Sequence, residues 1–543
     1  MMEKRLVLII FVLAVVLRFV GISQTPALNA DEAAIGYNAY SLLETGKDEH
    51  GHPWPIHFES FGDYKPGLIF YLVMPFIKLF GLNVVSVRFL PTLLGSLTII
   101  LIYYLSKEIY ELRLNKYLST SVLATFLLAV SPWHIQFSRG AWEVNVATFF
   151  IMLGTLLFLK AKENKRYYVF SFIFFTLSLY TYHSARLITP LIILGLIFFN
   201  FHRSIKQRKY IVIAFIVATI LSAPLLKDFL GEAGLSRASG VGLFADIGPF
   251  SRINEQRGEH QNYASFFAKV LHNKATNYGL AFLENWGEHY SGEYLFLSGD
   301  DIERNKVPET GQMYLFDILL VPLGLVVAIR NSRKTKIVLW WLLIAPVAAA
   351  LTFQSPHALR SQNMIIPLMI LSAYGLFILL KWANNQKLQF RNIIYAFIAL
   401  FVTWNITRYL HMYWVHMSKE YKYSSQYGVE ELVEYIKSRN YQDKDVVVTN
   451  RYDQPYILFL FYLKYPPEKF QNSHLLTTRD EFGFSTVNDF ANYHFKSIDF
   501  DSDKPRWVNS IIVGTEKDIP DEANIVKNIY GSNGLLYFQV VEN

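Results

Sequence analysis

The sequence predicts a polytopic α-helical membrane protein with about eleven transmembrane helices, outer-surface amphipathic helices and a small C-terminal extracytoplasmic α/β domain. Of its 543 residues, 52% are hydrophobic and 17% are charged, against about 25% charged in typical soluble domains. The apolar residues are gathered into long runs through the first three quarters of the chain. Membrane spans explain these runs better than a series of globular domains does.

A helix needs roughly 20 mostly apolar residues to cross the hydrocarbon core of a bilayer. Eleven runs are predicted as spans, near 5–22, 86–106, 117–132, 144–159, 167–182, 187–201, 210–226, 313–330, 337–353, 362–380 and 392–409. A twelfth apolar run, 66–82, contains Pro66, Pro75 and Lys78 and is short for a span.

The distribution of Lys and Arg decides the role of this twelfth run, because these residues mark the cytoplasmic side in short loops. If 66–82 does not cross, they fall in alternate loops, namely Lys4 and Arg5; Lys107, Arg113 and Lys116; Lys160, Lys162, Lys165 and Arg166; Arg203, Lys206, Arg208 and Lys209; Arg330, Arg333, Lys334 and Lys336; and Lys381, Lys387 and Arg391. The run 66–82 is therefore predicted as an outer-surface helix, with the N-terminus cytoplasmic and the C-terminus outside.

The first span has some features of a signal peptide, since Lys4 and Arg5 precede it and the small residue Ala30 lies before Asp31. Leu28 is a poor match to the small residue expected near a cleavage site, and the apolar run nearly reaches span length. We therefore expect the segment to be retained as an anchor.

Two larger hydrophilic regions are predicted outside the membrane. Residues 227–312 form a long outer loop that includes Arg252, Arg257, His260, His272, His289, Asp300 and Asp301. Residues 418–543 are predicted as the α/β domain, with a helix at 428–439 and strands at Val446–Thr449 and Ser510–Val513. The chain thus divides into a membrane domain, 1–417, with outer loop one at 23–85, and a C-terminal domain, 418–543.

Composition also excludes several classes of function. The chain has no cysteine, which rules out disulfides, thiolate catalysis and Cys-ligated metal centres. The net charge of +7 is explained by the cytoplasmic loops, so no nucleic-acid partner is needed.

The remaining ionisable residues are concentrated in the outer loops. They are Asp31, Glu32, Asp48, Glu49, His50, Asp63 and Lys65 in loop one, then Arg139, Glu143, His183, Arg186, His357 and Arg360 in later loops. Singly, such residues are often solvated acids, headgroup anchors or structural histidines. Together they suit transfer between lipid-linked and exported substrates, because a carboxylate can accept a proton from a hydroxyl and Lys or Arg can stabilise a departing phosphate. Aromatic-rich spans suit a polyprenyl tail.

Several stretches resemble glycosyltransferase family 39, a GT-C membrane family that includes protein O-mannosyltransferases and the lipid A aminoarabinose transferase. These are Asn29 to Tyr37, Thr45 to Gly51, Gly62 to Pro66, Leu79 to Asn83, Arg88 to Pro91, Ser138-Arg139 through Glu143, Tyr180 to Arg186 and Pro356 to Arg360. Their order and shared outer placement carry the resemblance over about 1–410. It is weaker in the C-terminal domain, at Tyr427 to Val429 and Tyr452 to Tyr465.

The resemblance implies an inverting glycosyltransferase that uses a polyprenyl-phosphate-linked sugar. Asp31 matches the catalytic base, with Glu32 beside it, and Glu143 matches a second acidic position where many relatives have Asp. Lys65, Arg360, His357 and Arg186 are expected at the donor phosphate, and Asp63, Tyr64, Arg139, His183 and Tyr37 are further pocket candidates. Gly67 replaces a proline that is frequent after Lys65-Pro66. No cofactor is firmly implied, and a divalent metal is neither required nor excluded.

Other classes of protein remain open. A flippase of lipid-linked sugars would place ionisable residues near the bilayer midplane, whereas the mid-span regions here are almost uncharged. A noncatalytic glycan- or lipid-binding scaffold leaves the outer acids without a purpose, and a polyprenyl-diphosphate-dependent ligase or polymerase shares the same compartment. The expected partners are the lipid-linked donor, the bilayer and an acceptor protein, lipid or glycan. The sequence names neither the sugar nor the acceptor.

Overall fold

The computed structural model of the protein describes all residues except 1, 230–241, 244–247, 332–333, 423, 425, 440, 442 and 481–483. Arg333, one of the basic loop residues, lies outside the described residues. The chain forms two compact units. The helical unit contains residues 1–18, 93–138 and 142–411, and the mixed unit contains 19–92, 139–141 and 412–543. This division differs from the predicted boundary at 417/418, because outer loop one packs with the C-terminal residues.

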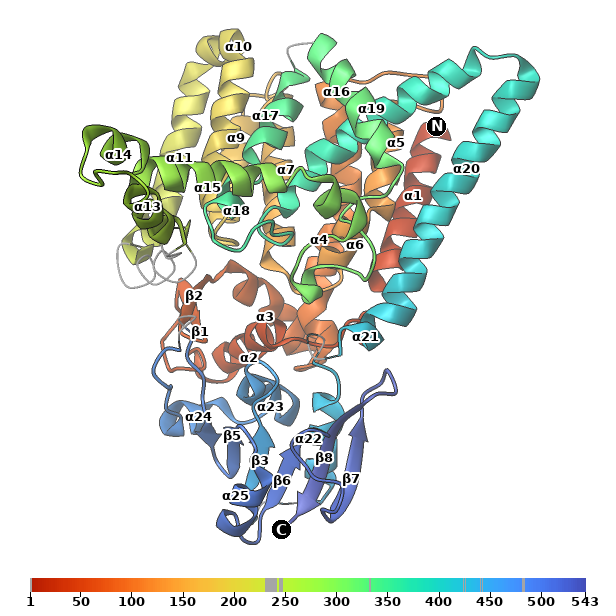
Figure 1. Ribbon diagram of the computed structural model, residues 1–543. Coiled ribbons are helices and arrows are strands. Elements are labelled where there is room, and N and C mark those ends of the chain that lie inside the picture. Colours follow the sequence, from red (N-terminus) through yellow and green to blue (C-terminus); the bar gives the residue numbers. More distant parts are fainter. Residues whose placement is uncertain are drawn as a thin grey trace. The chain divides into compact units, whose positions relative to one another are not determined.

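The helical unit is built of helices and their connections (Figure 1). Outside residues 230–312, its helices are α1 (Met2–Phe19), most of α4 (Val84–Ile109), α5 (Thr120–Val130), α6 (Pro132–Ser138), α7 (Glu143–Lys160), α8 (Tyr167–Leu179), α9 (Ala185–Phe199), α10 (Phe201–Lys206), α11 (Arg208–Phe229), α16 (Asp317–Arg330), α17 (Lys336–Ile344), α18 (Val347–Ala350), η4 (Gln362–Met364), α19 (Ile365–Asn384) and α20 (Leu388–His411). Each of the eleven predicted runs overlaps at least one of these helices.

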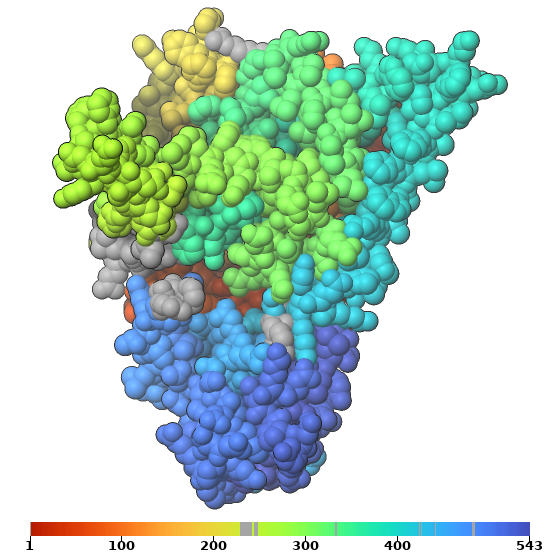
Figure 2. All heavy atoms as spheres, viewed as in Figure 1, coloured from red at the N-terminus to blue at the C-terminus, as the bar shows by residue number. Residues whose placement is uncertain are grey.

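Among the described residues, five helical segments are both long and apolar enough to cross a membrane, at Val84–Ile109, Glu143–Lys160, Arg208–Asp228, Gln362–Asn384 and Leu388–Glu420. Five further helices are apolar but shorter. The apolar windows of Arg208–Asp228 and Leu388–Glu420 are only 11% buried within the protein. In Figure 2, the atoms of α20 (turquoise) lie on the outside of the helical unit. These surfaces are suited to contact lipid.

Glycine allows two of the central helices to pack closely. Helices α16 and α19 lie against each other. A Cβ atom on Gly324 would lie 1.9 Å from the Leu371 carbonyl oxygen, and one on Gly375 would lie 2.0 Å from that of Leu320. Small residues at such crossings permit the backbone contact that stabilises helix pairs in membranes.

The segment predicted as a long loop, 227–312, contains regular structure. Its helices are α13 (Gly248–Gly258), α14 (Phe266–Leu271), α15 (Lys274–Glu288), η2 (Glu293–Leu297) and η3 (Glu303–Asn305). Helix α15 begins after Asn273, whose side chain accepts a hydrogen bond from the backbone N–H of Thr276. Such a cap stabilises a helix start, and the many polar residues of this segment had favoured the loop prediction.

The mixed unit begins with outer loop one. It contains α2 (Ala30–Thr45), β1 (His57–Ser60), β2 (Asp63–Pro66), α3 (Leu68–Phe80) and the first residues of α4. Asn29 and Glu32 form a capping box at the start of α2, and Gly46 ends the helix in the left-handed conformation. Strands β1 and β2 form an antiparallel hairpin in which Phe58 pairs with Lys65. The predicted helix at 66–82 corresponds to α3.

The C-terminal part of the mixed unit forms an α/β structure, and Figure 2 shows it in blue as a continuous body. Its elements are η5 (Met412–His416), α21 (Met417–Glu420), α22 (Val429–Arg439), β3 (Val446–Thr449), α23 (Pro455–Leu463), α24 (Pro467–Ser473), β4 (Asp489–Phe490), β5 (Tyr493–Lys496), α25 (Phe500–Arg506), β6 (Ile511–Gly514), β7 (Ile525–Tyr530) and β8 (Leu536–Glu542). The six strands have the order β4-β5-β3-β6-β8-β7. Strand β3 pairs in parallel with β5 and β6, and the other pairs are antiparallel. The predicted helix at 428–439 and both predicted strands are present.

Within this unit, the C-terminal helices pack directly on α2. A Cβ atom on Gly36 would lie 2.6 Å from the ring of Phe461 in α23, so the glycine permits close contact. The Tyr37 hydroxyl donates to the carbonyl of Tyr465 over 3.0 Å. The Gln471 side chain donates to the Ser41 hydroxyl over 3.0 Å. Outer loop one is therefore folded together with the C-terminal residues.

Candidate functional site

The candidate site in the mixed unit begins at the first turn of α2. The Asp31 carboxylate lies 2.5 Å from the Lys65 ammonium, which strand β2 presents. The Asp31 side chain is 27% exposed and that of Lys65 is 12% exposed. Lys65 also lies over the Phe61 ring, 5.1 Å from its centroid. The predicted base and the predicted phosphate-binding lysine thus form one partly exposed ion pair.

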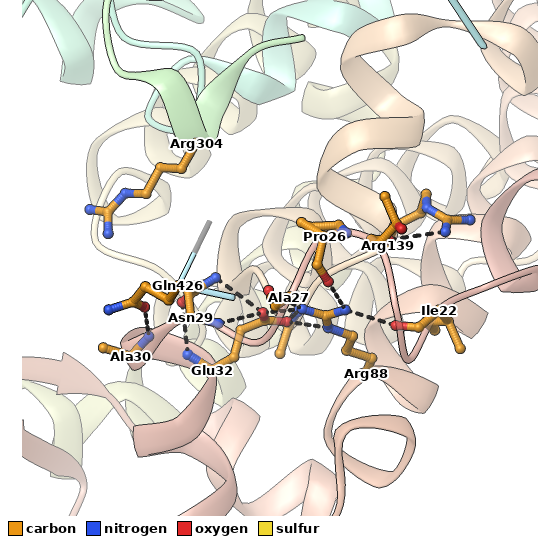
Figure 3. Close-up of polar contacts among 12 residues, drawn as sticks. Ile22, Pro26, Ala27, Asn29, Ala30, Glu32, Arg88, Arg139, Arg304 and Gln426 are labelled. Carbon is orange, nitrogen blue, oxygen red and sulfur yellow. Dashed lines mark hydrogen bonds and ion pairs between the residues drawn. The ribbon is translucent and has the colours of Figure 1, made fainter. Parts of the chain in front are cut away.

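Glu32, the neighbour of Asp31, is held inside the protein (Figure 3). It is 1% exposed and forms a bidentate ion pair with Arg88, with distances of 2.7 Å to Nε and 2.5 Å to Nη2. It also accepts hydrogen bonds from the Asn29 side chain and from the backbone N–H of Ala141. Since both its oxygens are occupied, Glu32 braces the start of α2.

The Arg88 guanidinium extends this brace to the segment before α2. It donates to the carbonyl oxygens of Ile22, Pro26 and Ala27 over 2.7 to 3.0 Å, as Figure 3 shows. Arg88 is fully buried, and its charge is tolerated there because the Glu32 carboxylate pairs with it. Arg88 had been noted from the sequence only as part of the resemblance.

Three other predicted pocket residues of this unit have defined contacts. Arg139 is fully buried, donates to the Tyr413 hydroxyl over 2.9 Å and lies over the Trp414 ring. Asp63 accepts a hydrogen bond from the backbone N–H of Tyr64 over 2.9 Å, and both residues are half-buried on β2. Tyr37 is buried and bonded to Tyr465, so its hydroxyl serves the packing of α2.

In the helical unit, the segment carrying His357 and Arg360 is anchored by Asp300. One Asp300 oxygen accepts a hydrogen bond from the backbone N–H of Ala358 over 2.6 Å and lies 3.7 Å from His357 Nδ1. The other accepts from the backbone N–H of Ile302. Burial raises the pKa of Asp300 above its ordinary value. Arg360 is half-buried, and its guanidinium donates to the Thr352 hydroxyl over 2.7 Å.

His289 supports the same segment. Its Nδ1 lies 2.7 Å from the Asn285 carbonyl oxygen and must donate to it, so Nε2 accepts from the backbone N–H of His357 over 3.1 Å. Burial lowers the pKa of His289 to about 4, which keeps the ring neutral and able to fill both roles.

The other predicted residues of the helical unit lie at helix starts. Glu143 is buried in the first turn of α7. Arg186, in the first turn of α9, lies 3.2 Å from His183 Nδ1 and also donates to the Leu179 carbonyl. His183 and Arg186, which the sequence places in the same loop, are in contact, and their role at a donor phosphate stays a prediction. Within the described part of the chain, no group of three or more His, Asp or Glu side chains is arranged to hold a metal ion.

Parts of the chain match known proteins in sequence. Residues 64–226 match the family model described as dolichyl-phosphate-mannose-protein mannosyltransferase. A curated relative, an uncharacterized protein from Aquifex aeolicus, is 27% identical over 170 residues, which are 31% of this chain and 32% of the relative. The alignment thus spans about a third of that relative's length.

Solved structures share the fold at low sequence identity. ArnT from Cupriavidus metallidurans in the apo state matches with a TM-score of 0.54 and 11% identity over 98% of this chain and 97% of its own. ArnT bound to undecaprenyl phosphate gives 0.53, with 10% identity and the same coverage. The oligosaccharyltransferase AglB from Archaeoglobus fulgidus, in complex with an inhibitory peptide and a dolichol-phosphate, gives 0.52 and 14% identity over 85% of this chain and 63% of its own.

The fold is therefore that of the GT-C membrane enzymes. The family match, over residues 64–226, agrees with this fold and with the resemblance seen in the sequence.

Proposed function

We propose that the protein transfers a sugar from a polyprenyl-phosphate donor to an acceptor at the outer face of the membrane. The Asp31–Lys65 ion pair carries this proposal. In the mixed unit it puts a proton acceptor beside a cation that can bind a phosphate, and both side chains keep part of their surface exposed. Sugar transfer needs a base for the acceptor hydroxyl and a cation for the departing phosphate, and Asp31 and Lys65 can supply these two groups.

The proposed reaction is a single displacement. The acceptor hydroxyl attacks the anomeric carbon while its proton passes to the Asp31 carboxylate. The bond between that carbon and the phosphate oxygen breaks, and the phosphate departs with the electron pair. Lys65 stabilises the charge that develops on this phosphate. The products are the glycosylated acceptor and polyprenyl phosphate, with the configuration at the sugar carbon inverted.

The other predicted residues receive supporting roles in this proposal. Glu32 braces α2 so that Asp31 is presented at its first turn. Arg360, with His357 and Arg186, is proposed to bind the donor, and Glu143 to act as a second acidic group; these roles come from the sequence resemblance. We further propose that the eleven apolar segments cross the membrane, that α3 lies at its outer surface and that residues 418–543 are extracytoplasmic.

The test is transfer by the purified protein from a panel of polyprenyl-phosphate sugars. Asp31→Asn should lower kcat by about 10²–10⁴-fold and leave polyprenyl phosphate binding intact. Lys65→Met should instead weaken that binding by about 10- to 100-fold, the value of a charge-assisted hydrogen bond. Near-normal turnover by Asp31→Asn would overturn the assignment of the base. Transfer only from polyprenyl-diphosphate donors would replace the function with that of a ligase.

A further inference from the structure

The turn between β1 and β2 contains a residue that its backbone conformation does not favour. Ser60 pairs with Asp63, so Phe61 and Gly62 form a two-residue connection. Their φ angles are 58° and 75°, as in a type I′ turn, in which both residues lie in the left-handed region. Glycine and asparagine adopt this region readily, whereas a bulky side chain is strained in it. Strained residues cluster at functional sites, so a phenylalanine here favours a role for its ring.

The Phe61 ring lies against the ammonium group of Lys65. The distance from Lys65 Nζ to the ring centroid is 5.1 Å, which is within the range of a cation–π contact. Phe61 is only 6% exposed, and its ring meets that of Tyr456 edge-on, with centroids 6.1 Å apart and planes at 84°. The ring is therefore packed against α23 and in turn supports the Lys65 ammonium.

The backbone of this turn is held by residues far along the chain. The Phe61 carbonyl accepts a hydrogen bond from the Ser485 backbone N–H over 2.9 Å, and the Gly62 carbonyl accepts one from the Arg479 guanidinium over 2.8 Å. A Cβ atom on Gly62 would lie 2.9 Å from the Ser485 hydroxyl oxygen, so the two segments are in close contact. These bonds stabilise the turn conformation that presents the Phe61 ring to Lys65.

We propose that Phe61 is a positioning residue for Lys65, and that Arg479 and Ser485 hold its turn in place. The inference rests on the proposed function for the role of Lys65. Lysine has a long, flexible side chain, and the Phe61 ring attracts its charge without neutralising it. The ring therefore restricts the ammonium while its positive charge stays available to a donor phosphate. A phosphate then meets a cation that is already in place, which lowers the entropic cost of binding.

The first experiment measures the affinity of the full-length protein for polyprenyl phosphate in variants of Phe61. Phe61→Leu keeps an apolar side chain but removes the aromatic face, so affinity should fall by about two- to thirtyfold, the value of a cation–π contact. Phe61→Tyr keeps the ring and should bind as the wild type does. Ala491→Leu changes another residue with positive φ, 49°, between β4 and β5, and should leave the affinity unchanged. Wild-type affinity in Phe61→Leu overturns the proposal.

A double-mutant cycle separates an action through Lys65 from ordinary packing of the ring. Phe61→Leu should lower the affinity of the wild type but have no further effect in Lys65→Met, because no ammonium remains to be positioned. If the ring only packs, the affinity falls by the same factor in both backgrounds, and the proposal is wrong. Arg479→Met should also weaken binding only when Lys65 is present. Unchanged binding in Arg479→Met would show that this arginine does not hold the turn.

Thermal unfolding without any ligand separates this inference from the proposed function. The contact between Phe61 and Lys65 exists in the free protein, so replacing either residue removes it, and the second replacement then costs less. The Tm losses of Phe61→Leu and Lys65→Met should together exceed that of the double variant by about 1–4 °C. Additive losses would refute the contact. If the wild type does not bind polyprenyl phosphate, the proposed function is wrong, whereas the coupling in Tm still shows that Phe61 holds Lys65.

Discussion

Replacing Arg88 by Met tests how the start of α2 is held. The guanidinium is fully buried and makes two bonds to Glu32 and three to the carbonyls of Ile22, Pro26 and Ala27. Methionine fills much of the same volume but removes the charge and every donor. Glu32 then becomes an uncompensated buried carboxylate.

The expected cost is large because the partner charge stays behind. Breaking a buried ion pair by removing one member costs about 3–5 kcal/mol. For a unit of roughly 200 residues, each kcal/mol lowers Tm by about 2–4 °C. Arg88→Met should therefore lower the Tm of the purified protein by about 6–20 °C. Glu32→Met combined with Arg88→Met should recover part of this loss, since no unpaired charge remains.

The control is Arg252→Met, which makes the same change in an exposed ion pair with Glu255. Exposed pairs contribute about 0–1 kcal/mol, so its Tm should stay within a few degrees of the wild type. Thermal unfolding of all four proteins in one detergent gives the comparison. If Arg88→Met has the same Tm as Arg252→Met, or if the Tm of the double variant is no higher than that of Arg88→Met, the Glu32–Arg88 pair does not hold the start of α2.

Two further predictions concern the helical unit. Gly324→Val should abolish the close contact of α16 with α19, because a Cβ at this position meets the Leu371 carbonyl oxygen at 1.9 Å; a lower monodisperse yield in size-exclusion chromatography is expected, and a wild-type yield would contradict the packing argument. Asp300→Ala should leave the backbone N–H groups of Ala358 and Ile302 without their acceptor, at about 1–3 kcal/mol for each buried orphaned donor. Its Tm should fall, and an unchanged Tm would show that Asp300 does not anchor this segment.

Much of the helical architecture could be predicted from the sequence, because a membrane helix depends on a contiguous run of apolar residues. Each of the eleven predicted runs overlaps a helix. The C-terminal strands at Val446–Thr449 and Ile511–Gly514 were also predictable from their unbroken apolar residues. In contrast, the helices within 227–312 were missed, since the residues there are largely polar.

Asp31 and Lys65 were singled out from the sequence one by one, their contact was not predicted, and their roles stay a prediction. Asp31 and Lys65 are 34 residues apart, and their ion pair depends on how the β1–β2 hairpin packs in the mixed unit. Arg88 is 56 residues from Glu32. The signal that could have found it is an arginine at the end of an apolar run that the sequence assigns to the outer side, against the usual distribution of positive charge. Its partner could not have been read from the sequence.

By itself, the sequence indicated which segments are apolar helices and which acids lie in outer loop one, whereas α2 was not predicted, although its start is set by local residues. The cap at Asn29 and the apolar runs are local features, decided by residues a few positions apart. The resemblance singled out Asp31 as the base, but only the tertiary structure shows why its environment differs from that of Glu32. Adjacent helical residues point about 100° apart, so one carboxylate remains partly exposed beside Lys65 while the other is buried against Arg88. Two neighbouring acids thus acquire different environments from the surfaces packed around one helical turn.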